Sequence, residues 1–182
     1  MQTYCPDKPL QPNPEFETAR ARALEDLAGA EIDEPITDII ESLNRLPFCY
    51  TLQCCFGHFV APEQPDDHNL ALVAESGPST HFLYRIAYVA FCVDASPDGK
   101  RLLNMLRDIP SRVDRDNVQF GCAQWFRDRC VNSYVLQIQP SGRADVDSLT
   151  VTRREALRIQ SARNRFWDTM REMLTGCKRE CP

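Results

Sequence analysis

Residues 33–60 read DEPITDIIESLNRLPFCYTLQCCFGHFV, and the pattern of this segment changes from helix to strand. In its first half, Asp33 is a candidate N-cap and Pro35 suits the first turn of a helix. The apolar residues that recur on one helical face are Ile36, Ile39, Ile40, Leu43 and Leu46. Pro47 ends this helix, and the aromatic and small apolar residues after it predict a strand that leads into a turn at Gly57.

The rest of the chain predicts helices and strands in an irregular order. Further helices are expected at residues 15–28, at 97–109 and from residue 152 to near the C-terminus. Pro110 is expected to end the second of these, and Thr152 with Glu155 has the spacing of a capping box at the start of the third. Further strands are expected at residues 70–73, 84–93, 118–126 and 133–139.

This order of elements indicates the fold class. Helices and strands do not alternate strictly, as they would in a parallel doubly wound sheet. We therefore predict an α+β fold, a single domain with a mostly antiparallel sheet flanked by helices and a long C-terminal helix. Four prolines make residues 1–15 an extended, Pro-rich lead-in, and residues 16–182 form the domain.

Composition limits the cellular setting. The 182 residues are 43% hydrophobic and 26% charged, which is typical of a globular domain. No run approaches the roughly 18 apolar residues of a membrane span, and the N-terminus lacks the pattern of a signal peptide. The nine cysteines, with Cys54 and Cys55 adjacent, fit a reduced compartment better than a disulfide framework. We expect a cytoplasmic protein with no membrane partner.

A group of thiol and imidazole side chains could carry chemistry, and its members are Cys49, Cys54, Cys55 and His58. Adjacent cysteines point to opposite faces of a strand, so a zinc site would need His81 or His68 and another donor from elsewhere. We expect no metal ion, because the spacing is not that of a common zinc motif and cysteines often serve as small buried apolar residues. A low-pKa thiol beside a histidine base is a further hypothesis.

The same region resembles a known family. Four short stretches are similar to the N-terminal signature of the wybutosine-synthesizing tRNA methyltransferases. They are Ile32-Asp33-Glu34, Ile39-Ile40, Leu43-Asn44 and Tyr50-Thr51 through Cys55-Phe56-Gly57. In that family an acid-capped helix ending in Leu-Asn or Ile-Asn precedes a Thr-Thr-Ser-Ser-Cys-small-Gly-Arg strand and turn. The matching positions are Asp33, Asn44, Thr51, Cys55 and Gly57, and Thr80-His81 corresponds to a family histidine.

The resemblance implies S-adenosylmethionine as cofactor and a modified guanosine of phenylalanine tRNA as substrate. It implies catalytic roles for His81 and Asp33, and binding roles for Thr51, Gln53, Cys54, Cys55, Gly57 and His58. The chain departs from the family where Gln53 and Cys54 replace serines and His58 replaces arginine, because histidine lacks arginine's permanent charge and planar fork.

The partner expected from these observations is a small molecule or nucleoside. The net charge of −5 disfavours a whole tRNA, since nucleic acid binds mainly through positive charge. A non-catalytic ligand-binding or regulatory module on the same fold, and a Cys/His metal or thiol site, are the alternative hypotheses.

Overall fold

The computed structural model describes residues 4–60, 81–143 and 146–180. The chain folds as an α+β domain with two antiparallel sheets, which confirms the predicted fold class. One sheet has the order β1-β6-β7-β5-β2, with strands β1 Tyr4–Cys5, β6 Val118–Ala123, β7 Ser133–Ile138, β5 Ala87–Val93 and β2 Cys49–Cys55. The other has the order β3-β4-β8, with strands β3 His58–Val60, β4 His81–Arg85 and β8 Ser148–Thr152.

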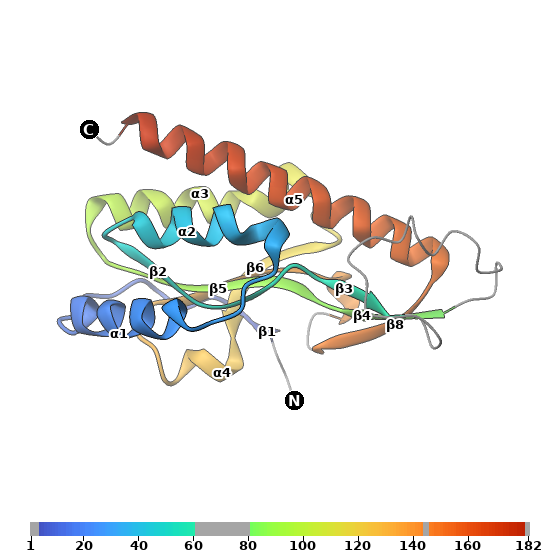
Figure 1. The fold of residues 1–182 in the computed structure, drawn as a ribbon, viewed down its shortest axis with the longest axis horizontal. Helices are drawn as coiled ribbons and strands as arrows, with labels where there is room; N and C mark the ends of the chain where they lie inside the picture. The colour runs from blue at the N-terminus through green and yellow to red at the C-terminus, as the bar shows by residue number, and fades with distance from the viewer. Residues whose placement is uncertain (1–3, 61–80, 144–145, 181–182) are drawn as a thin grey trace.

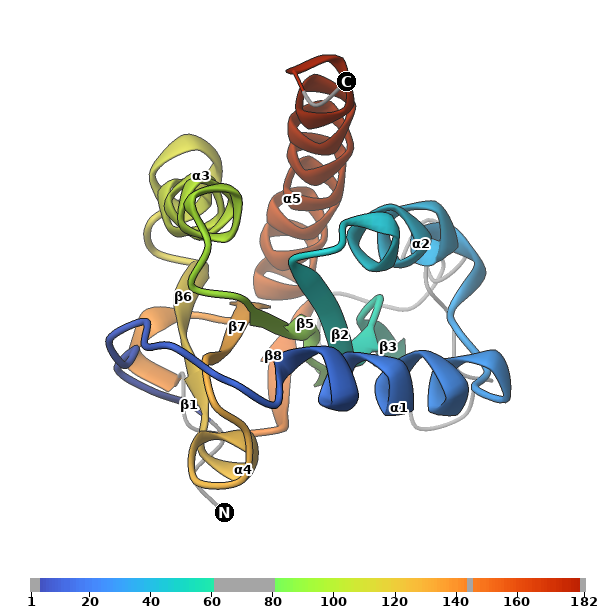
Figure 2. The same ribbon diagram turned by 90° about the vertical axis from the view of Figure 1, so that its left-hand side faces the viewer.

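Helices cover both faces of the larger sheet. They are α1 Phe16–Ala28, α2 Thr37–Arg45, α3 Pro97–Val113, α4 Gln124–Arg127 and α5 Arg153–Glu180, with short 3₁₀ turns η1 Glu34–Ile36 and η3 Ser141–Arg143. Figures 1 and 2 show α2, α3 and α5 on one face and α1 and α4 on the other. The smaller sheet lies under the N-terminal end of α5 (Figure 1).

The main core lies between the larger sheet and the layer of α2, α3 and α5. Val89 and Phe91 of the interior strand β5 belong to one buried cluster with Ile39, Leu103 and Phe166 of the three helices. Phe91 and Phe166 are fully buried, so α5 is attached to the sheet along its apolar face. A smaller cluster under α1 consists of Phe16, Tyr50 and Cys92.

The predicted strand 84–93 is in fact two strands in different sheets. Ile86 separates β4 from β5. The buried Tyr84 hydroxyl donates to the Ile138 carbonyl and accepts from the Ala87 N–H, both at 2.9 Å. This hydroxyl fixes the step between the sheets, whereas the sequence there shows a run that is apolar apart from Arg85.

Two other predicted boundaries are wrong. Pro110 does not end α3, which continues to Val113. Proline removes one backbone donor, but Ile109 and Val113 are both buried and keep the last turn packed on the core. The predicted strand 118–126 ends at Ala123, and α4 follows it directly.

Two strands arise where the sequence pattern predicted none. The lead-in supplies β1, which pairs with β6, and the segment before α5 supplies β8, which pairs with β4. The predicted start of α5 is confirmed, because the Thr152 N–H and hydroxyl donate to the Glu155 carboxylate at 2.8 and 2.9 Å. The predicted strand 70–73 lies outside the described residues. Among the described helices, none has the length and apolar character needed to cross a membrane.

Candidate functional site

The chain bends between β2 and β3 at Gly57, as predicted, and its φ there is +97°. L-residues rarely adopt this angle. A Cβ atom at this position would also lie 2.6 Å from the Ala87 Cβ. Both constraints require glycine at this position. The second also shows that the bend lies in close contact with the start of β5.

Three side chains hold the backbone of this bend. The Phe56 N–H donates to Oδ2 of Asp33 at 2.7 Å, and the Phe56 carbonyl accepts from the Trp167 indole at 3.2 Å. The Arg163 guanidinium donates to the Gly57 carbonyl at 2.7 Å. Asp33 occupies the N-cap position of η1, as predicted, but its side chain makes no capping hydrogen bond there. Its carboxylate instead satisfies the Phe56 N–H, which lies past the end of the β2–β5 ladder.

Arg163 is a buried cation on α5, with only 2% of its surface exposed. Its guanidinium carbon lies 4.1 Å from the centroid of the Phe56 ring and 5.5 Å from that of Phe59. Burial lowers the pKa of Arg163 to about 10. Sequence reasoning did not single out this residue, because it stands among other arginines of α5 and no pattern marks it as buried.

The bend brings together three residues that the sequence assigned to the site, namely Asp33, Cys55 and His58. His58 Nε2 lies 3.3 Å from Asp33 Oδ2, and one ligand-type atom from each of the three lies within 4.8 Å of the others. Cys54 does not belong to this cluster, because it packs against the main core. Burial, and then the nearby charges of Asp33 and Cys55, raise the pKa of the Cys54 thiol to about 11.

A cleft of about 640 Å³ is lined by residues of both sheets and of α4, and Cys55 is part of its wall. Trp125 of α4 is 50% exposed at this cleft, and the guanidinium carbon of Arg129 lies 3.9 Å from the centroid of its indole. The other aromatic and polar lining residues are Tyr88, Phe126, Gln53, Arg85, Gln137, Asp147 and Ser148. The cleft thus combines flat aromatic surface with a few hydrogen-bonding groups.

Strand register explains the floor of this cleft. Cys55 lies opposite Tyr88, and Tyr88 lies opposite Gln137 on the next strand. Alternate residues of a strand point to the same face, so Gln53 and Val135 line the cleft as well. Of the residues predicted to bind a ligand, Gln53 and Cys55 therefore lie in its wall.

Two predicted site residues lie elsewhere. Thr51 is buried, and the Asn44 side chain accepts from its N–H at 2.9 Å and donates to its hydroxyl at 2.7 Å, which ties β2 to α2. His81 is exposed at the start of β4, opposite Thr152. It is four residues from Arg85, the residue that lies opposite His58, and four residues correspond to about 13 Å along a strand. Both residues are thus apart from the cluster at the bend.

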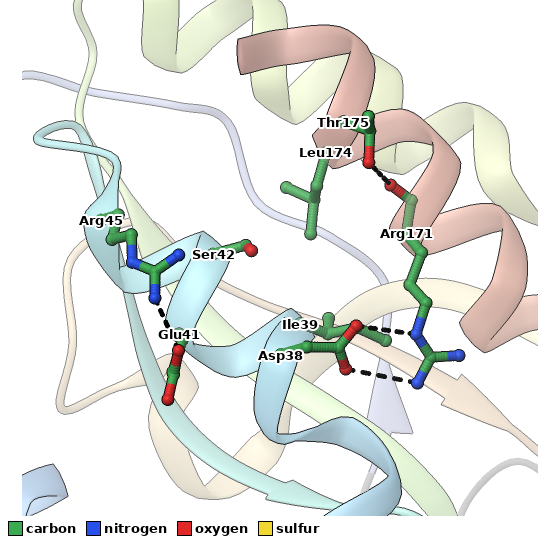
Figure 3. Close-up of a pocket in the computed structure, with 8 residues that line it drawn as sticks. All are labelled: Asp38, Ile39, Glu41, Ser42, Arg45, Arg171, Leu174 and Thr175. Atoms are coloured by element: carbon green, nitrogen blue, oxygen red, sulfur yellow. Dashed lines mark hydrogen bonds and ion pairs between the residues drawn. The ribbon is translucent and has the colours of Figure 1, made fainter.

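A smaller hollow of about 270 Å³ lies between α2 and the C-terminal half of α5 (Figure 3). Its charged side chains pair with one another. Arg171 contacts the two carboxylate oxygens of Asp38 at 2.8 and 3.3 Å, and Arg45 contacts Glu41 at 2.6 Å. Arg171 also donates to the Pro35 carbonyl, so it fastens α5 to the segment before α2. We interpret this hollow as a structural contact and the larger cleft as the candidate binding site.

Comparison with protein-family models gave no match, and comparison with curated proteins gave none either. Among solved structures, two of the PH1069 protein from Pyrococcus horikoshii are similar to this chain, each with a TM-score of 0.55. Their sequence identities to it are 18% and 16%, and the aligned regions cover 91% and 92% of this chain and 95% of each relative. At this level of identity the likeness concerns the fold alone.

Proposed function

We propose that this protein is an S-adenosylmethionine-dependent methyltransferase related to the wybutosine-synthesizing type, which acts on a modified nucleoside or a similar small molecule. The observation that carries this proposal is the cleft of about 640 Å³ with Trp125, Phe126 and Tyr88 in its wall. Its volume lies within the usual range of small-molecule sites, about 300–1,000 Å³. Aromatic walls with few polar groups are typical of sites for flat heterocycles.

The residues of the cleft fit an adenosyl group. Trp125 offers a half-exposed ring on which a purine can stack. The Asp147 carboxylate suits ribose hydroxyls, and the Arg85 guanidinium suits the carboxylate of the amino-acid part. When bound, the cofactor supplies an electrophilic methyl group on a sulfonium.

The chain's own contribution is mainly to hold the two reactants in contact, which accounts for much of the rate of such a displacement. Tyr88 lies in the cleft wall, where its hydroxyl can donate a hydrogen bond to a bound reactant. Burial, and then Cys55 and Cys54, raise the pKa of Tyr88, so this hydroxyl keeps its proton even in basic solution. The acidic net charge favours a nucleoside-sized acceptor over a whole tRNA.

Thermal-shift measurements with S-adenosylmethionine and S-adenosylhomocysteine test this proposal. A ligand at 100 times its Kd stabilises the native state by about 2.7 kcal/mol, which raises the Tm of a domain of this size by roughly 5–10 °C. Trp125→Ala should weaken binding by about 1–3 kcal/mol, or about 5- to 150-fold, because stacking is lost. Leu157→Ala is the matched control, since Leu157 is an exposed apolar residue of α5 outside the cleft.

No Tm shift with either ligand at millimolar concentration would refute the proposal, and so would an equal shift in the wild type and Trp125→Ala. A shift with adenosine but with neither adenosyl compound would instead support the alternative, a non-catalytic ligand-binding module that uses the same cleft.

A further inference from the structure

We propose that Asp33, Cys55 and His58 form a binding site for one divalent cation of the zinc class at the edge of the cleft. The three residues come from the segment before η1, from the end of β2 and from the start of β3. The sequence interpretation expected no metal, because the spacing of the cysteines and His58 is not that of a common zinc motif. The fold adds a donor that this spacing does not show, Asp33, which lies 25 residues before His58 in the chain.

The spacing of the donor atoms fits a tetrahedral ion. Zinc lies about 2.0–2.1 Å from imidazole nitrogen and carboxylate oxygen, so two such ligands of a tetrahedral ion are about 3.3 Å apart. His58 Nε2 and Asp33 Oδ2 are 3.3 Å apart. Cys55 Sγ completes a set in which all three atoms lie within 4.8 Å of one another. A zinc–sulfur bond of about 2.3 Å in a tetrahedral site places the sulfur about 3.6 Å from each of the other two ligand atoms, which is within that limit.

The chemistry of the donors selects the class of metal. Magnesium and calcium prefer sites built entirely from oxygen ligands, whereas thiolate and imidazole suit zinc and cobalt. One carboxylate and one thiolate carry two negative charges, which balance the charge of a divalent cation. Three protein ligands leave a fourth position for water or a ligand atom, as in catalytic rather than structural zinc sites.

Hydrogen bonds at the bend hold the ligand residues in place before any ion binds. The Phe56 N–H orients the Asp33 carboxylate by a hydrogen bond of 2.7 Å. Arg163 holds the Gly57 carbonyl between the two ligands that β2 and β3 contribute. Such partners of metal ligands commonly raise affinity by about 10- to 100-fold. Because Cys55 also lines the cleft, the ion would lie beside whatever ligand occupies it.

Titration of the full chain with Co²⁺ tests the site. Cobalt occupies zinc sites and gives a near-ultraviolet charge-transfer band when a thiolate binds it. We expect one equivalent of cobalt with this band, displaced by Zn²⁺. Cys55→Ser should abolish the band, whereas Cys54→Ser should keep it, because Cys54 packs against the core and lies outside the cluster. This pair of variants compares two adjacent cysteines.

Asp33→Asn provides a second probe, since asparagine can still accept from the Phe56 N–H and so preserve the bend. It should weaken cobalt binding by at least tenfold while far-ultraviolet circular dichroism stays unchanged. The inference is overturned if the wild type shows no thiolate band at saturating cobalt, or if the band in Cys55→Ser equals that of the wild type. Neither result depends on binding of an adenosyl compound, so the two proposals can fail separately.

Discussion

The substitution Gly57→Ala tests the central structural feature of the site, the bend that brings Asp33, Cys55 and His58 together. Two separate costs follow from the structure. The first is conformational, because alanine must adopt a φ of +97°, which costs about 1–3 kcal/mol. The second is steric, because the new Cβ would lie 2.6 Å from the Ala87 Cβ, and overpacking of this kind costs about 1–3 kcal/mol.

The two costs sum to a loss of about 2–6 kcal/mol in the free energy of unfolding. For a domain of this size that corresponds to a fall in Tm of at least about 4 °C. Urea denaturation and calorimetry measure these quantities. The double variant Gly57→Ala/Ala87→Gly should recover part of the steric cost and none of the conformational cost, because the backbone of residue 87 stays 3.1 Å from the added Cβ.

Gly142→Ala is the matched control, since a Cβ there meets nothing within 4 Å. It should change the free energy of unfolding by less than about 0.5 kcal/mol. If Gly57→Ala is as stable as Gly142→Ala, the bend does not have the conformation described and the account of the site fails.

Three further predictions concern other parts of the fold. Asn44→Ala leaves the buried Thr51 N–H without its acceptor and should cost about 1–3 kcal/mol in urea denaturation, whereas an unchanged midpoint would contradict the role of this pair. The hydrogen bond from Arg171 lowers the pKa of Asp38 in the folded protein. This ion pair therefore stabilises the fold at pH values above the pKa of an unfolded aspartate. The stabilisation is lost as the pH falls through the pKa of Asp38 in the folded protein. Asp38→Asn should therefore reduce the loss of stability between about pH 6 and about pH 2, and an identical pH dependence would argue against the ion pair. A hydrogen bond with the Cys92 thiol lowers the pKa of Cys130 to about 7. Cys130 should therefore be alkylated by iodoacetamide at neutral pH before Cys49 and Cys54, whose pKa is raised by burial, as peptide mass spectrometry can show. Equal labelling of the three thiols would count against this.

Local signals were sufficient for much of the fold. The apolar spacing of α2, the Thr152–Glu155 capping box and the glycine at position 57 each depend on neighbouring residues, and each has the predicted consequence. The errors arise where packing overrides a local signal. Pro110 is tolerated because the last turn of α3 is packed on the core, and the apolar run 84–93 divides because the Tyr84 hydroxyl bonds to a distant strand.

Part of the candidate site could also be predicted from the sequence. Residues Cys55 and His58 stand close together in the chain, and Asp33 was singled out for a different reason, as a helix cap. The aromatic wall of the cleft was not predicted, because Trp125 was assigned to a strand and instead belongs to α4. Nothing near Arg163 in the sequence indicates that it would bind the Gly57 carbonyl from 106 residues away.

The amino-acid sequence by itself determined the α+β class, the ends of most helices and the bend at Gly57, because helix periodicity, caps and backbone angles depend on residues within a few positions of one another. Only the tertiary structure decided which side chains meet. Asp33 reaches the bend, and Tyr88, Gln137 and Trp125 share a cleft, because separate strands and helices pack in one register. That register depends on burial across the whole domain, which no short segment encodes.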